Sequence, residues 1–183
     1  MMKLEARDRL SSYEDLTQWI DTQKKVFVAT PRGWPCSGRL TSHFGRRLDP
    51  FHHAYEETHL GLDIANVSGT PIRATADGVV RVASWKSGYG NVVVLQHDYG
   101  YQSRYAHASR IMVRAGDKVK RGQVITLMGA TGRASGPHLH YEVWRYNQRK
   151  NPLAFLKEDP TGTGGIVTQD IVPAPVKTAK IGI

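Results

Sequence analysis

The chain has 183 residues and a mass of 20.4 kDa, which suffices for one ordinary domain with appendages and is too little for two full domains. Hydrophobic residues make up 40% of it, so it can build a core, and wholesale disorder is excluded. The formal charge is +9, and +8 of this falls between residues 39 and 156. An excess of basic charge in the middle of the chain favours a polyanionic partner.

Targeting and redox signals are sparse. Cys36 is the single cysteine, which excludes an intramolecular disulfide framework and a zinc site of several cysteines. The longest aliphatic run, residues 92–95, is far shorter than the roughly 20 residues of a membrane span, so no span is expected. Acidic residues and the lack of an apolar stretch at the N-terminus are incompatible with a signal peptide. If the protein acts outside the cytoplasm, we expect this chain to be a fragment of something longer or to rely on it; whether that is a membrane-anchored protein, and by which route it is exported, stay open.

The first predicted element is a helix over about residues 4–25. Leu10, Tyr13 and Ile20 recur there at helical spacing among polar side chains. Such a narrow apolar stripe is typical of a docking helix or of the end of a coiled coil. Self-association, docking on the rest of the chain and an inhibitory position over a groove of the folded domain all stay open.

Further along, the hydrophobic period changes to two, which is typical of strands. The predicted strands are short and rich in Val, Ile, Tyr and Trp, and they cover residues 79–85, 91–97, 102–108, 118–128 and 138–146. Turns containing Gly or Asp separate them. This spacing predicts an all-β fold, a compact antiparallel sandwich or barrel-like domain.

Helix breakers suggest the domain limits. Pro and Gly in residues 31–35 end the helix, and a stretch rich in Gly and Pro begins at Lys157. We therefore expect an N-terminal helix and linker in residues 1–33, one β domain in residues 34–156, and a flexible tail in residues 157–183.

Two strand-like segments carry residues that bind metals. In an extended strand, His59 and Asp63 would share one face opposite apolar side chains, and His138, His140 and Glu142 would do the same in a second strand. A single histidine on a strand is usually structural, but two such patterns together indicate a metal site. Three ligands of the N,N,O type with a fourth position open are what a catalytic zinc requires.

The sequence lacks the His-Glu-x-x-His helix of one zinc-protease class, so its glutamate base is missing. Histidines would have to take over the proton transfers. His107, in a segment with sequence Tyr-Ala-His-Ala-Ser, is the natural additional candidate.

These motifs resemble, in order and spacing, those of the lysostaphin/LytM-type zinc endopeptidases. The likeness includes Ser-His-Phe-Gly-Arg-Arg, His-Leu-Gly-Leu-Asp, Tyr-Ala-His and Gly-Pro-His-Leu-His-Tyr-Glu-Val, and it runs from about residue 34 to 156. Members of that family hydrolyse peptide bonds in the cross-links or stem peptides of bacterial peptidoglycan. Their fold is a compact antiparallel β domain, built as a duplicated hybrid motif, which agrees with the predicted strands.

The resemblance implies specific roles. His59, Asp63 and His140 would bind one Zn²⁺ per chain, and His107 and His138 would be the catalytic histidines beside the water that attacks the substrate. It also implies peptidoglycan as partner and a place in the cell envelope, periplasmic or extracellular. Which peptide bond is cleaved stays open.

A turn of small residues precedes the second histidine motif. The turn of residues 133–137 contains small side chains, which suit a position that a substrate backbone approaches closely. Arg133, Ser135 and Gly136 of this turn are therefore candidates for substrate binding.

One loop departs from the family pattern. Relatives often place a histidine or serine where Asp49 stands, and His52 and His53 are additional. Both histidines could be surface residues or could line the groove, so substrate choice is open there.

Parts of the sequence are compatible with three other functions. Some relatives have lost ligands and activate other wall hydrolases without catalysis; this sequence keeps all five positions, so we predict an active enzyme. Residues 113–125 resemble hairpins of biotinyl/lipoyl and sugar-phosphotransferase carriers, but a carrier would have no use for Asp63. The basic charge alone prompts nucleic-acid binding, which we do not expect because neither a motif nor an aromatic and basic face supports it.

Overall fold

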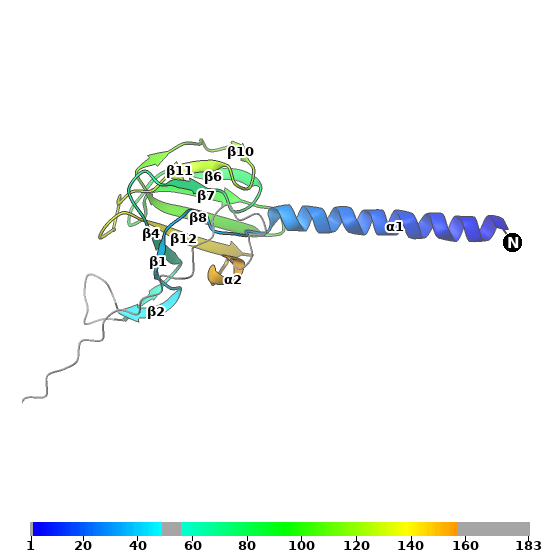
Figure 1. Cartoon of the computed structure of the whole chain (residues 1–183), viewed down its shortest axis with the longest axis horizontal. Helices are drawn as coiled ribbons and strands as arrows, with labels where there is room; N and C mark the ends of the chain where they lie inside the picture. Colours follow the sequence, from blue (N-terminus) through cyan, green and yellow to red (C-terminus); the bar gives the residue numbers. More distant parts are fainter. Residues whose placement is uncertain (1, 49–55, 157–183) are drawn as a thin grey trace, which may run out of the picture.

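A computed structural model describes residues 2–48 and 56–156 of the chain (Figure 1). Asp49, His52, His53 and the predicted tail lie outside these residues. Within the described ranges, no helix has the length and apolar character needed to cross a membrane.

The N-terminal helix is longer than predicted. Helix α1 spans Met2–Ala29 and projects from the β domain, leaving it at the end opposite strands β1 and β2 (Figure 1). Its end is held by Arg121, whose Nη2 donates to the carbonyl of Val28 at 3.4 Å and to that of Thr30, just beyond the helix, at 3.0 Å. The amide of Asp77 also donates to the carbonyl of Val28. The apolar side chain of Leu16 is 52% exposed, so self-association or docking through this helix stays a prediction.

In the described residues, fourteen further elements follow α1. They are β1 (Arg39–Ser42), β2 (Gly45–Leu48), β3 (Glu56–His59), β4 (Leu62–Ala65), β5 (Pro71–Arg73), β6 (Gly78–Lys86), β7 (Gly90–Gln96), β8 (Tyr101–Ala108), β9 (Arg110–Ile111), β10 (Lys118–Val119), β11 (Val124–Leu127), β12 (His138–Arg145), β13 (Gln148–Lys150) and α2 (Leu153–Leu156).

The described strands form three antiparallel sheets. The largest has the order β1-β4-β12-β8-β7-β6-β10, with β13 paired to the second half of β12. Smaller sheets have the order β5-β11-β9 and β2-β3. This architecture confirms the predicted all-β class with an N-terminal helix.

Two predicted strands are wrong in detail. Residues 118–128 divide between β10 and β11, which belong to different sheets, because the chain turns at Gly122, whose φ of +83° favours glycine. The extended segment expected from His59 to residue 64 is also interrupted, since His59 ends β3 and the next strand begins at Leu62.

The core lies on one face of the central strands. Tyr105 of β8 and Leu139, Tyr141 and Val143 of β12 are fully buried there, in a cluster with Leu62 of β4 and Leu95 of β7. A smaller buried cluster is formed by Val92, Val94 and Ala106. Because side chains alternate along a strand, His140 and Glu142 point to the opposite face. The strands that carry the core therefore also present the polar groups of the site.

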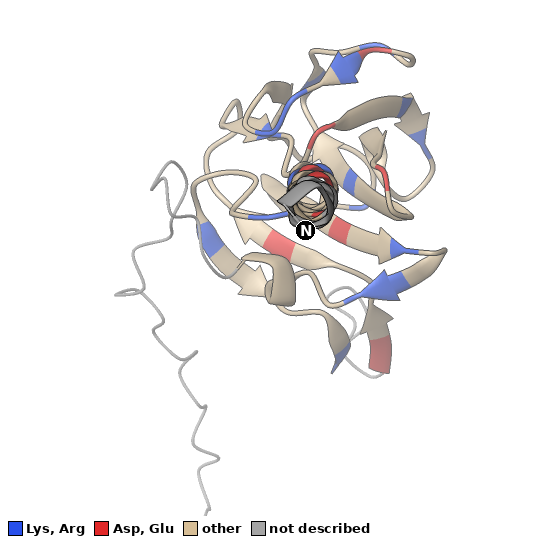
Figure 2. Ribbon diagram, turned by 90° about the vertical axis from the view of Figure 1, so that its right-hand side faces the viewer, with Lys and Arg blue, Asp and Glu red and all other residues tan. Residues whose placement is uncertain are grey.

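Basic residues are spread over the β domain. In the view along α1, Lys and Arg lie on several strands and loops and do not gather in one patch (Figure 2). Along the ribbon, the basic positions are thus distributed over several elements.

Candidate metal centre

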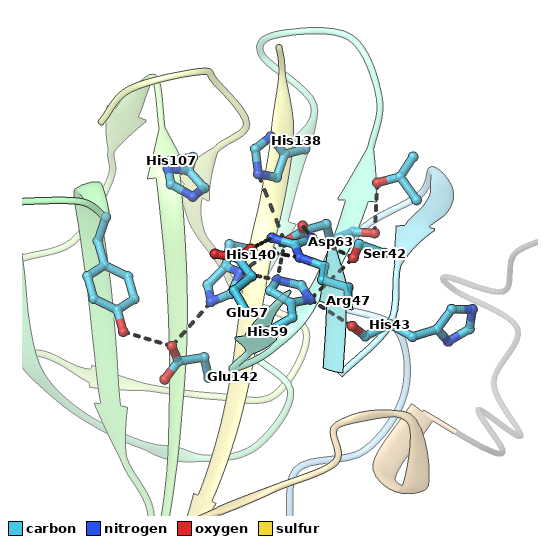
Figure 3. Close-up of polar contacts among 12 residues, drawn as sticks. Ser42, His43, Arg47, Glu57, His59, Asp63, His107, His138, His140 and Glu142 are labelled. Atoms are coloured by element: carbon cyan, nitrogen blue, oxygen red, sulfur yellow. Dashed lines mark hydrogen bonds and ion pairs between the residues drawn. The ribbon is translucent and has the colours of Figure 1, made fainter. Parts of the chain in front are cut away.

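Three candidate ligands meet above the central sheet (Figure 3). His140 of β12 lies opposite Asp63 of β4 in the strand register, and His59 reaches them from the end of β3. His59 Nε2 is 3.0 Å from His140 Nδ1, and Asp63 Oδ1 is 3.1 Å from the former and 2.9 Å from the latter. All three residues are buried.

These atoms fit a zinc ion. Two imidazole nitrogens and one carboxylate oxygen are a ligand set found in catalytic zinc sites. Ligands about 2.0–2.1 Å from a tetrahedral zinc lie about 3.3 Å from one another, close to the 2.9–3.1 Å separations of His59, Asp63 and His140. The donor set therefore suits the metal that the sequence predicts.

The strand alternation expected for His59 and Asp63 is not what brings them together. The chain bends at Gly61, between β3 and β4. A Cβ at Gly61 would lie 2.4 Å from the carbonyl oxygen of Tyr141 and 2.9 Å from Cε1 of His140. Glycine is required here because β12 and the His140 ring pack directly against the backbone.

Each ligand histidine has a partner on its other ring nitrogen. His59 Nδ1 donates to the carbonyl of His43 at 2.8 Å, and His140 Nε2 lies 3.2 Å from Glu142 Oε1. With that nitrogen protonated, the lone pair of the remaining nitrogen is directed at the metal position. The sequence placed Glu142 on the same face as His140 without assigning it a role.

His107 and His138 lie side by side above the ligands, with ring centroids 4.7 Å apart (Figure 3). His107 Nδ1 donates to the carbonyl of Thr131 at 2.7 Å, and His138 Nδ1 to that of Gly136 at 2.8 Å. Both Nε2 atoms are thereby left as acceptors, and that of His138 is 3.9 Å from Asp63 Oδ1. His107 has a φ of +61°, a strained backbone of the kind that clusters at functional sites.

The protonation states of the site follow from its contacts. Burial lowers the pKa of His107 to about 4, so this residue is neutral at pH 7. Burial disfavours protonation of His140 as well, but hydrogen bonds with Asp63 and Glu142 outweigh it and raise the pKa of His140 to about 9. For Asp63 too, burial is opposed and outweighed by hydrogen bonds from His140 and His59, which lower its pKa.

Arg47 is a component of the site that sequence reasoning missed. Its Nη1 donates to Asp63 Oδ2 at 3.1 Å, and its Nε donates to Glu57 Oε1 at 2.9 Å. The guanidinium thus compensates the negative charge of Asp63 on Oδ2, the carboxylate oxygen that does not face the histidines. Arg47 belongs to one of the family motifs, which was the signal available for it.

A cleft of about 480 Å³ opens over these residues. The five histidine and aspartate candidates line it, together with Arg47, Glu57, Arg133, Ser135 and Gly136. Every described site residue predicted from the sequence therefore lies at this cleft.

Known proteins with related sequences include a peptidase and a murein hydrolase activator. Residues 57–152 match the model of peptidase family M23. The DD-carboxypeptidase/endopeptidase Mpg of Neisseria meningitidis serogroup B is 43% identical over 122 residues, which are 67% of this chain and 28% of that protein. The murein hydrolase activator NlpD of Salmonella dublin is 39% identical over 126 residues, 68% of this chain and 31% of that protein. The chain thus spans less than a third of the length of these relatives.

Solved structures share the fold. A zinc-containing peptidase from Vibrio cholerae is 38% identical with a TM-score of 0.60, over 72% of this chain and 39% of that one. The catalytic domain of the antimicrobial peptidase lysostaphin from Staphylococcus simulans is 30% identical, also with a TM-score of 0.60, over 66% of this chain and 93% of that one. The resemblance to lysostaphin expected from the motifs is confirmed.

Proposed function

The chain belongs to peptidase family M23, and we propose that it is a zinc-dependent endopeptidase that hydrolyses peptide bonds in bacterial peptidoglycan. The observation that carries the proposal is the convergence of His59 Nε2, His140 Nδ1 and Asp63 Oδ1 to within 2.9–3.1 Å of one another. Similarity to a DD-carboxypeptidase/endopeptidase and to a peptidoglycan DD-endopeptidase supports peptidoglycan as substrate, and a protein with this substrate would act in the cell envelope or outside the cell.

His59, Asp63 and His140 would hold the metal. Zinc bound in this way polarises a scissile carbonyl and makes water a nucleophile near pH 7. Arg47 and Glu142 keep the ligand side chains in place through their contacts with Asp63 Oδ2 and His140 Nε2.

The two further histidines move protons. Nε2 of His107 and of His138 accept hydrogen bonds from the attacking water and orient it. The nitrogen that takes the proton of this water can then donate to the oxyanion of the tetrahedral intermediate and pass the proton to the leaving amine. The low pKa of His107 keeps its nitrogen free to accept a hydrogen bond at neutral pH. Their Nδ1 contacts to Thr131 and Gly136 hold both rings in the required orientation.

Substrate capture uses the rest of the cleft. Arg133, Ser135 and Gly136 form a wall beside which a peptide backbone could lie. We take residues 34–156 as the catalytic unit. Its positive charge favours adsorption to anionic cell walls, and because salt screens attraction between charges exposed to solvent, this adsorption is expected to weaken as the salt concentration rises.

A second candidate function is activation of another wall hydrolase. It is favoured by 39% identity to the murein hydrolase activator NlpD. The presence of all five predicted metal and catalytic positions favours the enzyme instead.

The test combines metal analysis with digestion. The purified protein should contain about one zinc per chain, and peptidoglycan incubated with it should yield fragments whose masses identify the cleaved bond. His59→Ala and Asp63→Ala should lose both zinc and hydrolysis, because two ligands do not retain the ion. Wild-type protein that holds zinc and leaves peptidoglycan intact, yet stimulates another hydrolase, would instead support the activator.

A further inference from the structure

Glu142 is a fully buried carboxylate next to the metal centre, with 0% of its surface exposed. It lies on β12 two residues after His140, on the same face of the strand (Figure 3). An isolated carboxylate in such a position is strongly destabilising, so its partners indicate why it is there.

Both carboxylate oxygens have defined partners. Oε1 accepts a hydrogen bond from the Tyr89 hydroxyl at 2.9 Å and lies 3.2 Å from His140 Nε2. Oε2 accepts from Trp144 Nε1 at 2.6 Å and lies 3.7 Å from Nη1 of Arg104. The carboxylate can therefore rotate little, and the direction in which it presents Oε1 to His140 is fixed.

The partners are themselves held in place. The guanidinium carbons of Arg104 and Arg149 each lie 4.3 Å from the centroid of the Trp144 ring. Such cation–π contacts restrain the indole, which in turn restrains Glu142. Trp144 is four residues beyond His140, or about 13 Å along the strand, so the support of the ligand extends well outside the cleft.

We propose that Glu142 is a positioning residue of the metal centre, which accepts the Nε2–H of His140 and so turns the Nδ1 lone pair toward His59 and Asp63. Tyr89 and Trp144 position Glu142 in turn. The inference rests on the proposed function, because it concerns how the zinc ligand His140 is oriented. Carboxylate partners of metal-bound histidines act in this way in other zinc sites, where their removal weakens metal binding by about 10- to 100-fold.

The most direct variant is Glu142→Gln, which preserves shape and removes the charge. A glutamine replaces one acceptor oxygen by an NH₂ donor. If the NH₂ faces the Oε1 side it meets the N–H of His140, and if it faces the Oε2 side it meets the N–H of Trp144. Trp144 Nε1 and Arg104 on the Oε2 side can only donate, whereas the Tyr89 hydroxyl on the Oε1 side can also accept. We therefore expect the NH₂ to face His140 and the zinc affinity to fall about 10- to 100-fold.

The double variant Glu142→Gln with Trp144→Phe separates positioning from mere packing. Phenylalanine removes the indole donor, so the amide can turn its NH₂ to that side and offer its oxygen to His140 again. The double variant should therefore bind zinc more tightly than Glu142→Gln alone, although it lacks one more native hydrogen bond. A purely structural role predicts that the second substitution lowers stability further and restores nothing.

The matched control is Tyr141→Phe, in the residue between His140 and Glu142. Its hydroxyl faces the core and contacts Thr75 Oγ1 at 2.8 Å, so the variant loses a buried hydrogen bond of the same strand on the other face. We expect a lower melting temperature and an unchanged zinc affinity.

The experiment is chelator competition for zinc on the full chain, with thermal unfolding of each metal-free variant as the control for folding. Weaker binding in Glu142→Gln, partial recovery in the double variant and wild-type affinity in Tyr141→Phe would support the inference. If wild-type protein binds zinc and Glu142→Gln binds it equally well, or the double variant recovers nothing, the positioning role is wrong and the proposed function stands. If wild-type protein binds no zinc, the proposed function falls and the inference with it.

Discussion

Two buried polar networks lie on opposite faces of the same strands, β8 and β12. One is the metal centre with His140 and Glu142, and the other lies in the core and includes His97, Tyr105 and Tyr141. Both contain buried histidine, but they differ in how their hydrogen-bond donors and acceptors are matched.

The core network is closed. His97 Nδ1 donates to the carbonyl of Asp77 at 2.7 Å, and its Nε2 lies 2.7 Å from Ser103 Oγ. Ser103 Oγ has one hydrogen, which it donates to that Nε2, and it lies 3.0 Å from the Tyr105 hydroxyl, from which it accepts; the same Tyr105 oxygen also contacts Oγ1 of Thr75. Every polar atom of this chain has a partner of opposite kind, so neutral side chains satisfy one another without an ion.

The metal centre is not closed in this way. When its histidines are neutral and their outer nitrogens are protonated, His59 Nε2, His140 Nδ1 and Asp63 Oδ1 present three acceptors to one another. Three acceptors repel one another unless a cation lies between them. In metal-free protein a proton on His140 serves this purpose, and the pKa of His140 is accordingly raised to about 9. Unmatched lone pairs, more than the presence of buried histidines, thus distinguish the binding site from the structural network.

Replacing His107 or His138 by Ala should have the largest effect. We expect peptidoglycan hydrolysis to fall by about 10²- to 10⁴-fold, because proton transfer at Nε2 is lost, while zinc stays bound by the other three residues. Hydrolysis rates and metal content of each variant would check this. Loss of zinc in either variant would mean that the assignment of roles is wrong and that the centre extends beyond three ligands.

Tyr105→Phe should have a smaller effect, which is confined to the core network. The Tyr105 hydroxyl accepts from the backbone amide of Thr75 at 3.0 Å, and its removal leaves that buried donor unsatisfied. We expect the free energy of unfolding to fall by about 1–3 kcal/mol and zinc affinity to be unchanged. Denaturant unfolding with metal analysis tests this; weakened zinc binding would show that the two faces of the sheet are coupled.

The pH dependence of stability should differ in sign between the networks. Burial lowers the pKa of His97, so its contribution is complete above the unfolded-state pKa of about 6.5 and is lost as the pH falls below that value. The pKa of His140 is raised to about 9, so in metal-free protein its contribution is complete below about 6.5 and is lost as the pH rises through 9.

Unfolding of metal-free wild-type and His97→Gln protein between pH 4 and 7 measures the first effect, with a slope of at most about 1.4 kcal/mol per pH unit. The variant should show the smaller loss of stability on acidification. Equal slopes in the two proteins would assign the acid sensitivity to other groups.

Much of the fold was predictable because it depends on local pattern. The alternation of apolar residues predicted both ends of β6, β7, β8 and β12 to within one residue, since one face of each strand is buried in the core. It failed for residues 118–128, where a turn at Gly122 sends the chain from one sheet to another. Turns of this kind depend on where the partner strands lie, which a local period does not encode.

The sequence by itself determined which residues form the candidate site. His59, Asp63, His107, His138 and His140 were singled out by residue type, by spacing and by resemblance to a family, and they line one cleft. What only the tertiary structure decided is how they are aimed. The bend at Gly61, the register of His140 against Asp63, and the contacts of Arg47 and Glu142 join segments far apart in the chain. Strand pairing sets these contacts, and a metal centre depends on the direction of each lone pair as much as on the identity of its ligands.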